Sequence, residues 1–227
     1  MLPPLRIGIA TPMANPTVEP ELRALFPPEV NMLVTRSVAE GDSKTRLIRY
    51  FKQLPETLDS FGGMRLHAFG FACTASSYLL DAGLEKKTCA ALAKRHGYSV
   101  ITASGAIKAA LHQQRIRRLA IASPYPAWIA TACAAFWERQ GFDVVASSSA
   151  AERMEDTRAI YTLDPLKAAE HFTADFTGVE ADALLITGTG LPTLPLLDSV
   201  EQALDLPVLT SNQCLAKACL AAARDSA

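Results

Sequence analysis

Short apolar runs alternate with longer amphipathic stretches along the whole chain, and this alternation predicts the secondary structure. In the first half, apolar runs of strand length occupy residues 6–12, 31–36, 69–73 and 99–103. Stretches with helical spacing of apolar residues follow these runs, beginning near residue 18 and covering residues 44–61, 81–96 and 106–114. Pro55 falls inside one of these helices and is expected to kink or divide it. Strands that alternate with helices in this way are typical of a mostly parallel sheet with helices on both faces.

The same pattern starts again at residue 118, where the segment 118–124 repeats the arrangement of residues 6–12. The strands of the second half follow in the same order, at residues 118–124, 142–147, 184–189 and 207–212. In this repeat Gly188 falls opposite Cys73. Self-similarity of this length predicts two structural units of the same kind within one chain.

The repeat predicts an α/β fold of two lobes related by a pseudo-twofold axis, residues 1–115 and 116–227, each with a mostly parallel four-stranded sheet flanked by helices. The helix that ends the first lobe is free to pack on the other lobe. Ligands of parallel sheets bind outside the carboxyl ends of the strands, so the active site is expected in the cleft between the lobes. Four loops would surround it, Thr11–Asn15, Cys73–Ser77, Ser123–Tyr125 and Thr187–Gly190. Their hydroxyl, amide and backbone N–H groups suit the binding of oxyanions, although ordinary turns and helix caps would use the same residue types.

Cys73 stands at the centre of the most distinctive stretch, Phe69–Ser77. An apolar strand ends at this cysteine, and three hydroxyl residues follow within four positions at the start of a helix. Free backbone N–H groups at such a helix start favour an anion, either a thiolate or a substrate carboxylate. The alternative is a buried, inert cysteine followed by a capping serine.

Composition and charge restrict the classes of function. The 227 residues carry a net charge of −1, so a nucleic-acid partner is not expected. The sequence shows no signal peptide and no run long enough to span a membrane, which predicts a cytoplasmic protein without a membrane partner. Five cysteines without a CxxC pair and four scattered histidines predict neither disulfides nor a metal site. No GxGxxG or Walker-type loop is present, so no nucleotide cofactor is expected.

Four segments of the chain, taken in order, resemble the aspartate/glutamate racemase superfamily, in particular its maleate cis–trans isomerase and arylmalonate decarboxylase branch. They are Thr11–Glu21 (TPMANPTVEPE), Ala72–Ser76 (ACTAS), Ser123–Tyr125 (SPY) and Pro207–Gln213 (PVLTSNQ). The resemblance implies a cofactor-independent enzyme that acts on a small carboxylate or dicarboxylate. It also implies a homo-oligomer.

The resemblance also assigns roles to individual residues. Cys73 matches the thiol of the first lobe, and Asn15 matches the residue that holds a substrate carboxylate in maleate isomerases. Tyr125 matches a tyrosine that hydrogen-bonds a substrate carboxylate. Thr74 and Ser76 lie where the decarboxylase gathers donors around an enediolate. In the second lobe, the matching substrate-binding positions are Gly188, Thr189 and Gly190.

This chain departs from the two-thiol members of the superfamily at Gly188, where they carry a second cysteine. Cys214 lies beyond the next strand and is expected in the core. A second departure is Asp156-Thr157, where maleate isomerases have Asp-Asn. The four loops contain no lysine or arginine, so neutral donors are expected to bind the carboxylate, while Arg36 and Lys44 are expected to be surface charges.

A single thiol limits the chemistry. Racemisation needs an acid and a base on opposite faces of the substrate, so a two-thiol racemase is excluded. The favoured hypothesis is decarboxylation of a malonate-type acid through an enediolate, with Cys73 as the proton donor. The first alternative is a maleate-type cis–trans isomerase in which Cys73 is a covalent nucleophile. The second is a carboxylate-binding protein without catalysis.

Residues outside the four loops are expected to play smaller parts. Trp128, Trp137 and Phe136 are expected in the core, with lining of the cleft as the alternative for Trp128, and His67 is expected at the end of the sheet away from the site. The stretch 147–152 is expected to be a flexible loop that could close over the cleft. The apolar side of the pocket would come from residues such as Met13, Tyr50, Trp128, Leu191 and Pro192.

Overall fold

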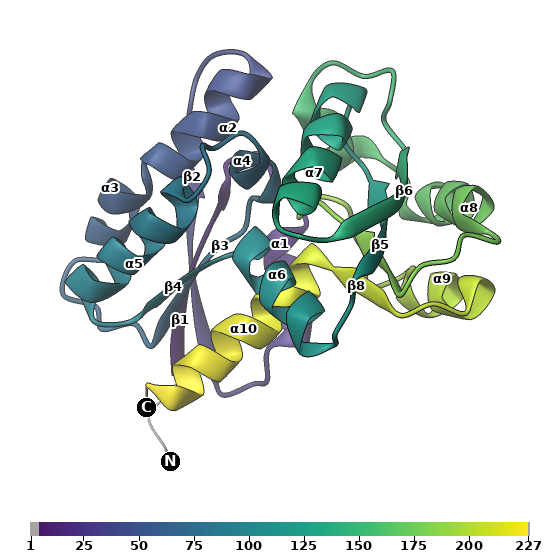
Figure 1. Cartoon of the computed structure of the whole chain (residues 1–227). Coiled ribbons are helices and arrows are strands. Elements are labelled where there is room, and N and C mark those ends of the chain that lie inside the picture. Colours follow the sequence, from purple (N-terminus) through teal and green to yellow (C-terminus); the bar gives the residue numbers. More distant parts are fainter. Residues whose placement is uncertain (1–4, 227) are drawn as a thin grey trace.

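The computed structural model describes residues 5–226, and its first half is built on a four-stranded parallel sheet (Figure 1). The strand order is β2-β1-β3-β4, with bounds β1 (Leu5–Pro12), β2 (Val30–Ser37), β3 (Ala68–Phe71) and β4 (Ser99–Thr102). Every residue of β3 is buried, as expected for a central parallel strand whose two faces are both covered by helices.

Six helices accompany this sheet. They are α1 (Val18–Leu25), α2 (Ser43–Lys52), α3 (Leu54–Asp59), α4 (Thr74–Tyr78), α5 (Leu84–His96) and α6 (Ala103–Gln113). The stretch 44–61 forms two helices because α2 ends at Lys52 and Pro55 occupies the first turn of α3. The helix predicted from residue 81 begins at Leu84, after Gly83 in a left-handed conformation.

The second half repeats this architecture. Its parallel sheet has the order β6-β5-β7-β8, with bounds β5 (Arg118–Ser123), β6 (Asp143–Ser149), β7 (Ala183–Ile186) and β8 (Val208–Thr210). Its other elements are α7 (Ala127–Arg139), the 3₁₀ helix η1 (Thr157–Thr162), α8 (Pro165–Phe176), α9 (Leu197–Leu204) and α10 (Ser211–Asp225). The predicted fold of two sheets flanked by helices is therefore confirmed.

The strand register shows which residues of the two halves occupy equivalent positions. Ala10 pairs with Phe71 in the first sheet, and Ala122 pairs with Ile186 in the second. Cys73 lies two residues beyond Phe71, and Gly188 lies two residues beyond Ile186. The two positions are therefore equivalent, at the carboxyl ends of the central strands β3 and β7.

The last helix, α10, packs against the first sheet although it follows β8 in the chain. It contacts β1, β3 and β4, together with α1 and α6 (Figure 1, yellow). The contact is close because Gly70 in β3 has no side chain, and a Cβ at that position would lie 2.9 Å from Cys219 Sγ. Cys214 and Cys219 are both buried in this layer, as expected for core cysteines.

Candidate active site

Cys73 lies between the end of β3 and the start of α4, where its backbone is extended and acts as the N-cap residue. The side chain is 3% exposed. The Ser76 hydroxyl lies 3.1 Å from Cys73 Sγ and 2.7 Å from the carbonyl oxygen of Leu47. A hydroxyl has one hydrogen, so Ser76 can either donate to Leu47 and accept from the thiol or donate to the thiolate.

Burial raises the pKa of the Cys73 thiol above its ordinary value. The hydroxyl of Ser76 and the backbone N–H groups of Ser76 and Ala75 act in the opposite direction, because they stabilise the thiolate. Burial is the larger effect, so the resting side chain is a thiol.

Five of the residues predicted for the site line one cavity together: Asn15, Cys73, Tyr125, Thr189 and Gly190. They come from the carboxyl ends of both sheets. The cavity measures about 20 Å³, which is room for roughly one water molecule. In this closed state it does not hold a substrate, so the residues that cover it must move when one enters.

Asn15 is held in place by both ends of its side-chain amide. Its Oδ1 accepts hydrogen bonds from the backbone N–H groups of Thr17, at 2.9 Å, and Val18, at 3.2 Å. Its Nδ2 donates to the backbone oxygen and to the hydroxyl of Thr189, both at 3.3 Å. Thr189 Oγ1 in turn donates to the carbonyl oxygen of Ala72 at 2.9 Å. These bonds join the two lobes directly beside Cys73.

Thr74 and Ser76 are buried behind the cavity wall. Thr74 reaches the site through Tyr125, since the two hydroxyl oxygens lie 3.4 Å apart, and Ser76 reaches it through Cys73. Burial raises the pKa of Tyr125 well above its ordinary value. The phenol therefore stays protonated and can donate a hydrogen bond into the cavity.

Gly188 also lies behind the cavity wall, in a conformation with φ of +88°. A Cβ at this position would lie 2.8 Å from Pro124 Cγ, 2.9 Å from Ile160 Cδ1 and 3.2 Å from Tyr125 Cε2. The place equivalent to Cys73 is therefore filled by neighbouring side chains, and no second thiol faces the first.

Two arginines line the cavity, and the expectation that only neutral donors surround it is wrong. Arg46 comes from α2 and Arg158 from η1. Arg46 donates to Asp156 Oδ1 at 2.7 Å, and Arg158 donates to Asp156 Oδ2 at 2.6 Å. The hydrogen bonds and charge of these guanidinium groups lower the pKa of Asp156 to about 2. Arg46 precedes Tyr50, another lining residue, by one helical turn. This spacing on α2 indicates that both side chains lie on the same face of the helix, the face toward the cavity.

Most of the remaining lining residues that the sequence did not indicate come from η1, the segment that covers the cavity. Thr157, Ile160 and Tyr161 belong to η1, and Pro12 and Leu47 complete the wall. The stretch 147–152 was expected to be the closing loop, but residues 147–149 continue β6. The cover therefore begins later in the chain than predicted.

Several residues outside the predicted site have structural roles. Arg36 donates to the carbonyl oxygens of Met13, at 2.8 Å, and Asn15, at 3.0 Å, and thereby fixes the first loop. His67 Nδ1 accepts from the N–H of Arg6 at the opposite end of the sheet. Trp137 is fully buried, whereas Trp128 is partly exposed, donates to the carbonyl of Glu155 and does not line the cavity. Met13 and Lys44 are exposed, and Leu191 is buried away from the cavity.

Two searches of the described part of the chain complete the picture of the site. Within residues 5–226, no group of three His, Cys, Asp or Glu side chains is arranged to hold a metal ion. Over the same residues, no helix is both long and apolar enough to cross a membrane.

Two facing parallel sheets with a thiol at the end of β3 define a protein of the aspartate/glutamate racemase superfamily, in the branch of maleate isomerases and arylmalonate decarboxylases. The model of the arylmalonate decarboxylase family matches residues 7–226, and the chain therefore belongs to that family.

Individual proteins similar to this chain come from both sides of the branch. The maleate isomerase of Pseudomonas putida is 25% identical over 227 residues, covering 91% of this chain and 86% of the relative. A maleate cis–trans isomerase of Nocardia farcinica, with one cysteine replaced by serine and a covalently bound succinylcysteine intermediate, has a TM-score of 0.86 and 24% identity over 96% of this chain and 92% of its own. A liganded arylmalonate decarboxylase with one glycine-to-cysteine and one cysteine-to-serine substitution has a TM-score of 0.82 and 19% identity over 99% of this chain and 94% of its own.

Proposed function

We propose that this protein is a cofactor-independent cis–trans isomerase of a small, maleate-like dicarboxylate, with Cys73 as the covalent nucleophile. The observation that carries the proposal is the joint lining of one cavity by the Cys73 thiol and the guanidinium groups of Arg46 and Arg158. A cis-dicarboxylate brings two negative charges close together, and the two arginines together with the ionised Asp156 leave one net positive charge beside it.

The side chain of Asp156 supports this use of the arginines. Its carboxylate accepts from Arg46 and from Arg158 at the same time, so the two guanidinium groups are spaced to share a carboxylate. Each guanidinium has five N–H donors, and those that are not bound to Asp156 or, in Arg46, to the carbonyl oxygen of Gly41 and the hydroxyl of Ser43 can bind a substrate.

The resting Cys73 thiol first gives its proton to solvent, and the reaction then balances with the Cys73 thiolate alone. The thiolate sulfur adds to one alkene carbon, forming a C–S bond, and the π electrons move into the neighbouring carboxylate as an enediolate. The remaining C–C single bond rotates. The enediolate electrons then re-form the double bond and expel the Cys73 thiolate, which leaves the trans isomer. No C–H bond breaks at any step.

The neutral donors around the cavity suit the enediolate. Tyr125 stays protonated and can donate to the enediolate, and Asn15 becomes a second donor when its amide exchanges Thr189 for the substrate. Donors that are already oriented toward a developing charge stabilise it without reorganisation. The covalent succinylcysteine in the Nocardia farcinica mutant, which lacks one cysteine, supports addition by a single thiol in this branch.

The arginines also favour isomerisation over decarboxylation. A leaving carboxylate loses its charge as CO₂ forms, so a cation bound to it stabilises the substrate more than the transition state. In isomerisation neither carboxylate loses its charge, and the one that becomes the enediolate gains negative charge. The same two arginines therefore oppose one reaction and are compatible with the other.

Decarboxylation of a malonate-type acid is the second candidate, and the resting protonation state of Cys73 favours it. In this reaction the C–CO₂ bond breaks, its electrons enter the remaining carboxylate as an enediolate, and the Cys73 thiol gives its proton to the α-carbon. Burial keeps the thiol protonated, as a proton donor must be. With Gly188 opposite, one face of the enediolate would receive the proton.

Proton NMR in D₂O distinguishes the two reactions. Maleate and a disubstituted arylmalonate are each incubated with the wild type, with Cys73→Ala and with Cys214→Ala, whose cysteine is buried in α10 away from the cavity. We expect fumarate without deuterium from maleate, lost in Cys73→Ala and kept in Cys214→Ala. A deuterated monoacid from the arylmalonate, with maleate unchanged, would establish the decarboxylase instead. No turnover of either, together with binding of both, would support a non-catalytic binding protein.

A further inference from the structure

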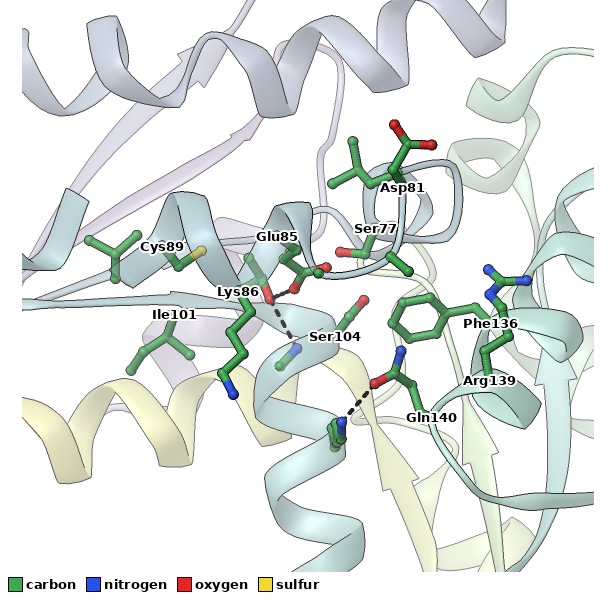
Figure 2. A pocket seen from close by; sticks show the side chains of 17 residues that line it. Ser77, Asp81, Glu85, Lys86, Cys89, Ile101, Ser104, Phe136, Arg139 and Gln140 are labelled. Carbon is green, nitrogen blue, oxygen red and sulfur yellow. Dashed lines mark hydrogen bonds between the residues drawn. The ribbon is translucent and has the colours of Figure 1, made fainter. Parts of the chain in front are cut away.

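A second pocket of about 550 Å³ lies beside α4 and shares no lining residue with the cavity at Cys73 (Figure 2). Its walls come from the end of α4 and the start of α5, from strand β4, from the first turns of α6 and from the end of α7. A pocket of this size is typical of a site for a small organic molecule.

Part of the wall is apolar. Leu80, Cys89, Val100, Ile101 and Phe136 contribute carbon and sulfur surface from three elements and from the loop between α4 and α5. Figure 2 shows Phe136 at one end of the pocket and Ile101 with Cys89 toward the other. An apolar body between these ends would lose contact with water on several sides.

Two serines in the wall are almost completely buried, since Ser77 and Ser104 are each 1% exposed. The Ser77 hydroxyl acts on the Glu85 carboxylate and lowers its pKa, whereas the Oγ atom of Ser104 has no hydrogen-bond partner among the described residues. Figure 2 shows both serines between Glu85 and Phe136. Buried hydroxyl groups are almost always hydrogen-bonded in folded proteins, so the Ser104 hydroxyl points to a polar group that belongs in the pocket.

Positive charge exceeds negative charge around the pocket. Lys86, Lys108 and Arg139 line it together with Asp81 and Glu85, and none of the three cations forms an ion pair within residues 5–226. Lys108 Nζ donates to Gln140 at 2.7 Å and has further donors free. The positive end of the α6 dipole lies at the same wall, because that helix begins at Ala103.

Glu85 balances part of this excess. Its carboxylate accepts from Thr102 Oγ1, and burial raises its pKa while Thr102, Ser77 and the charge of Lys108 act in the opposite direction. Asp81 is exposed at the rim. The pocket therefore combines an apolar wall, one unpaired hydroxyl group and more cations than anions, which together match one chemical class of ligand.

We propose that this pocket is a binding site for a small monocarboxylate with an apolar body, separate from the catalytic cavity. The carboxylate lies against the hydroxyl of Ser104 and against the ammonium group of Lys108. The apolar body lies between Phe136 and Ile101. This site is independent of which reaction Cys73 performs.

Isothermal titration calorimetry with 4-phenylbutyrate tests the proposal, and 4-phenyl-1-butanol serves as the neutral probe of the same shape. We expect the carboxylate to bind the wild type, and Lys108→Met to weaken it by about tenfold because one charge-assisted hydrogen bond is lost. Binding of the alcohol should be the same in both. Lys87→Met, which changes a lysine of α5 that does not line the pocket, is the matched control and should bind like the wild type.

A further variant separates this pocket from the catalytic cavity, which also contains cations. If Arg46→Met abolishes binding of 4-phenylbutyrate and Lys108→Met leaves it unchanged, the probe occupies the cavity at Cys73 and the proposal is overturned. Absence of binding to the wild type overturns it as well. A third outcome also overturns the proposal: the wild type is a dimer that does not bind the probe, and Ile101→Asp dissociates it. A second copy of the chain would then fill the pocket. Thermal unfolding of each variant verifies that it is folded.

Discussion

At the scale of single residues, the protonation state of Cys73 decides which reaction the site can perform. Addition to an alkene needs the thiolate, and burial raises the pKa of the thiol. We therefore expect kcat/KM for maleate to rise with pH and to level off only above the ordinary thiol range, since this parameter reports the free enzyme. A profile measured from about pH 6 to about pH 10 brackets that range.

A decarboxylase would give the opposite profile. Its proton donor is the thiol, so kcat/KM for an arylmalonate would fall as the pH rises through the pKa of Cys73. A falling profile would contradict the covalent mechanism even if both substrates were converted.

Arg46 is expected to bind a substrate carboxylate, and Arg46→Met should raise KM for maleate by roughly 10-fold to 100-fold, as loss of a charge-assisted hydrogen bond does. The effect on kcat should be smaller, because Arg46 binds a carboxylate that is already charged in the substrate as well as in the transition state. Steady-state kinetics with maleate and with its monomethyl ester measure both effects. The variant should lose most of the preference for the dicarboxylate.

Arg49 provides the control for Arg46. It lies on the same helix, is exposed and donates to the carbonyl oxygen of Glu40. Arg49→Met should leave KM unchanged, and an equal rise in both variants would mean that α2, rather than the guanidinium group of Arg46, is responsible.

Gly188 is expected to resist any side chain. Gly188→Ala combines a strained positive φ with the contacts at Pro124 and Ile160, and should lower the free energy of unfolding by about 1–3 kcal/mol for the backbone alone. Gly178→Ala isolates the backbone effect, because Gly178 has a φ of +78° and nothing within 4 Å of the added Cβ. Urea unfolding should show the larger loss for Gly188→Ala, and equal losses would mean that the neighbours yield to a side chain.

The sequence predicts that the Cys73 thiol lies at the site, but it does not predict that Arg46 and Arg158 do. Cys73 and Asn15 sit at strand ends, where the apolar pattern stops at a defined residue and the topology brings the loops together. Arg46 and Arg158 reach the same cavity from a helix and from a cover segment. The positions of the strand ends do not predict these two arginines at the cavity, because the position of each arginine depends on how α2 and η1 pack.

At the scale of secondary-structure elements, the apolar runs predict the eight strands and their order, because each central strand is buried on both faces. Proline and glycine explain two of the differences between predicted and observed helices, at Pro55 and Gly83. The 3₁₀ helix η1 has no periodic apolar pattern, so its position over the cavity becomes visible only in the folded chain.

The contact of η1 with α2 is expected to control access to Cys73. Asp156 joins the two through Arg46, and a side-chain pKa lowered to about 2 means that this bridge is lost only in strong acid. Asp156→Asn should therefore speed alkylation of Cys73 by iodoacetamide and amide exchange in residues 157–162 at neutral pH. Global stability should change by no more than about 1 kcal/mol, because the aspartate is partly exposed.

The matched control for this variant is Asp59→Asn, which breaks an exposed ion pair with Arg95 elsewhere on the surface. Alkylation of Cys73 at the wild-type rate in Asp156→Asn would show that the cover opens without breaking this bridge. Mass spectrometry of the alkylated peptide gives the rate for Cys73 separately from the other four cysteines.

At the scale of the whole molecule, the lobes are joined by buried hydrogen bonds as well as by α10. Thr17 Oγ1 donates to the carbonyl oxygen of Gly190 at 2.7 Å, and Tyr78 is hydrogen-bonded to Thr187. The division of the chain at residues 115 and 116 remains a prediction from the repeat. The repeat carries no signal that α10, from the second half of the chain, covers the first sheet.

Glu21 is the strongest of these connections and carries the last prediction. This buried carboxylate of α1 accepts from the N–H of Leu194 at 2.8 Å, from Asn212 Nδ2 at 2.7 Å and from both the N–H and the hydroxyl of Thr193. All of these partners donate, and they lie in the second half of the chain. An ionised carboxylate accepts at both oxygens, so it can satisfy them together.

Glu21→Gln keeps the shape of the side chain but replaces one acceptor by an amide that also donates. We expect a loss of about 1–3 kcal/mol in the free energy of unfolding, because a buried donor such as Asn212 Nδ2 is left facing another donor. Glu19→Gln, on the partly exposed side of the same helix, should cost less, since its partner Arg36 remains solvated and keeps its bonds to the loop carbonyls. Urea unfolding of both variants tests this difference. Equal stability of Glu21→Gln and the wild type would mean that neutral hydrogen bonds suffice to hold the two lobes around Cys73.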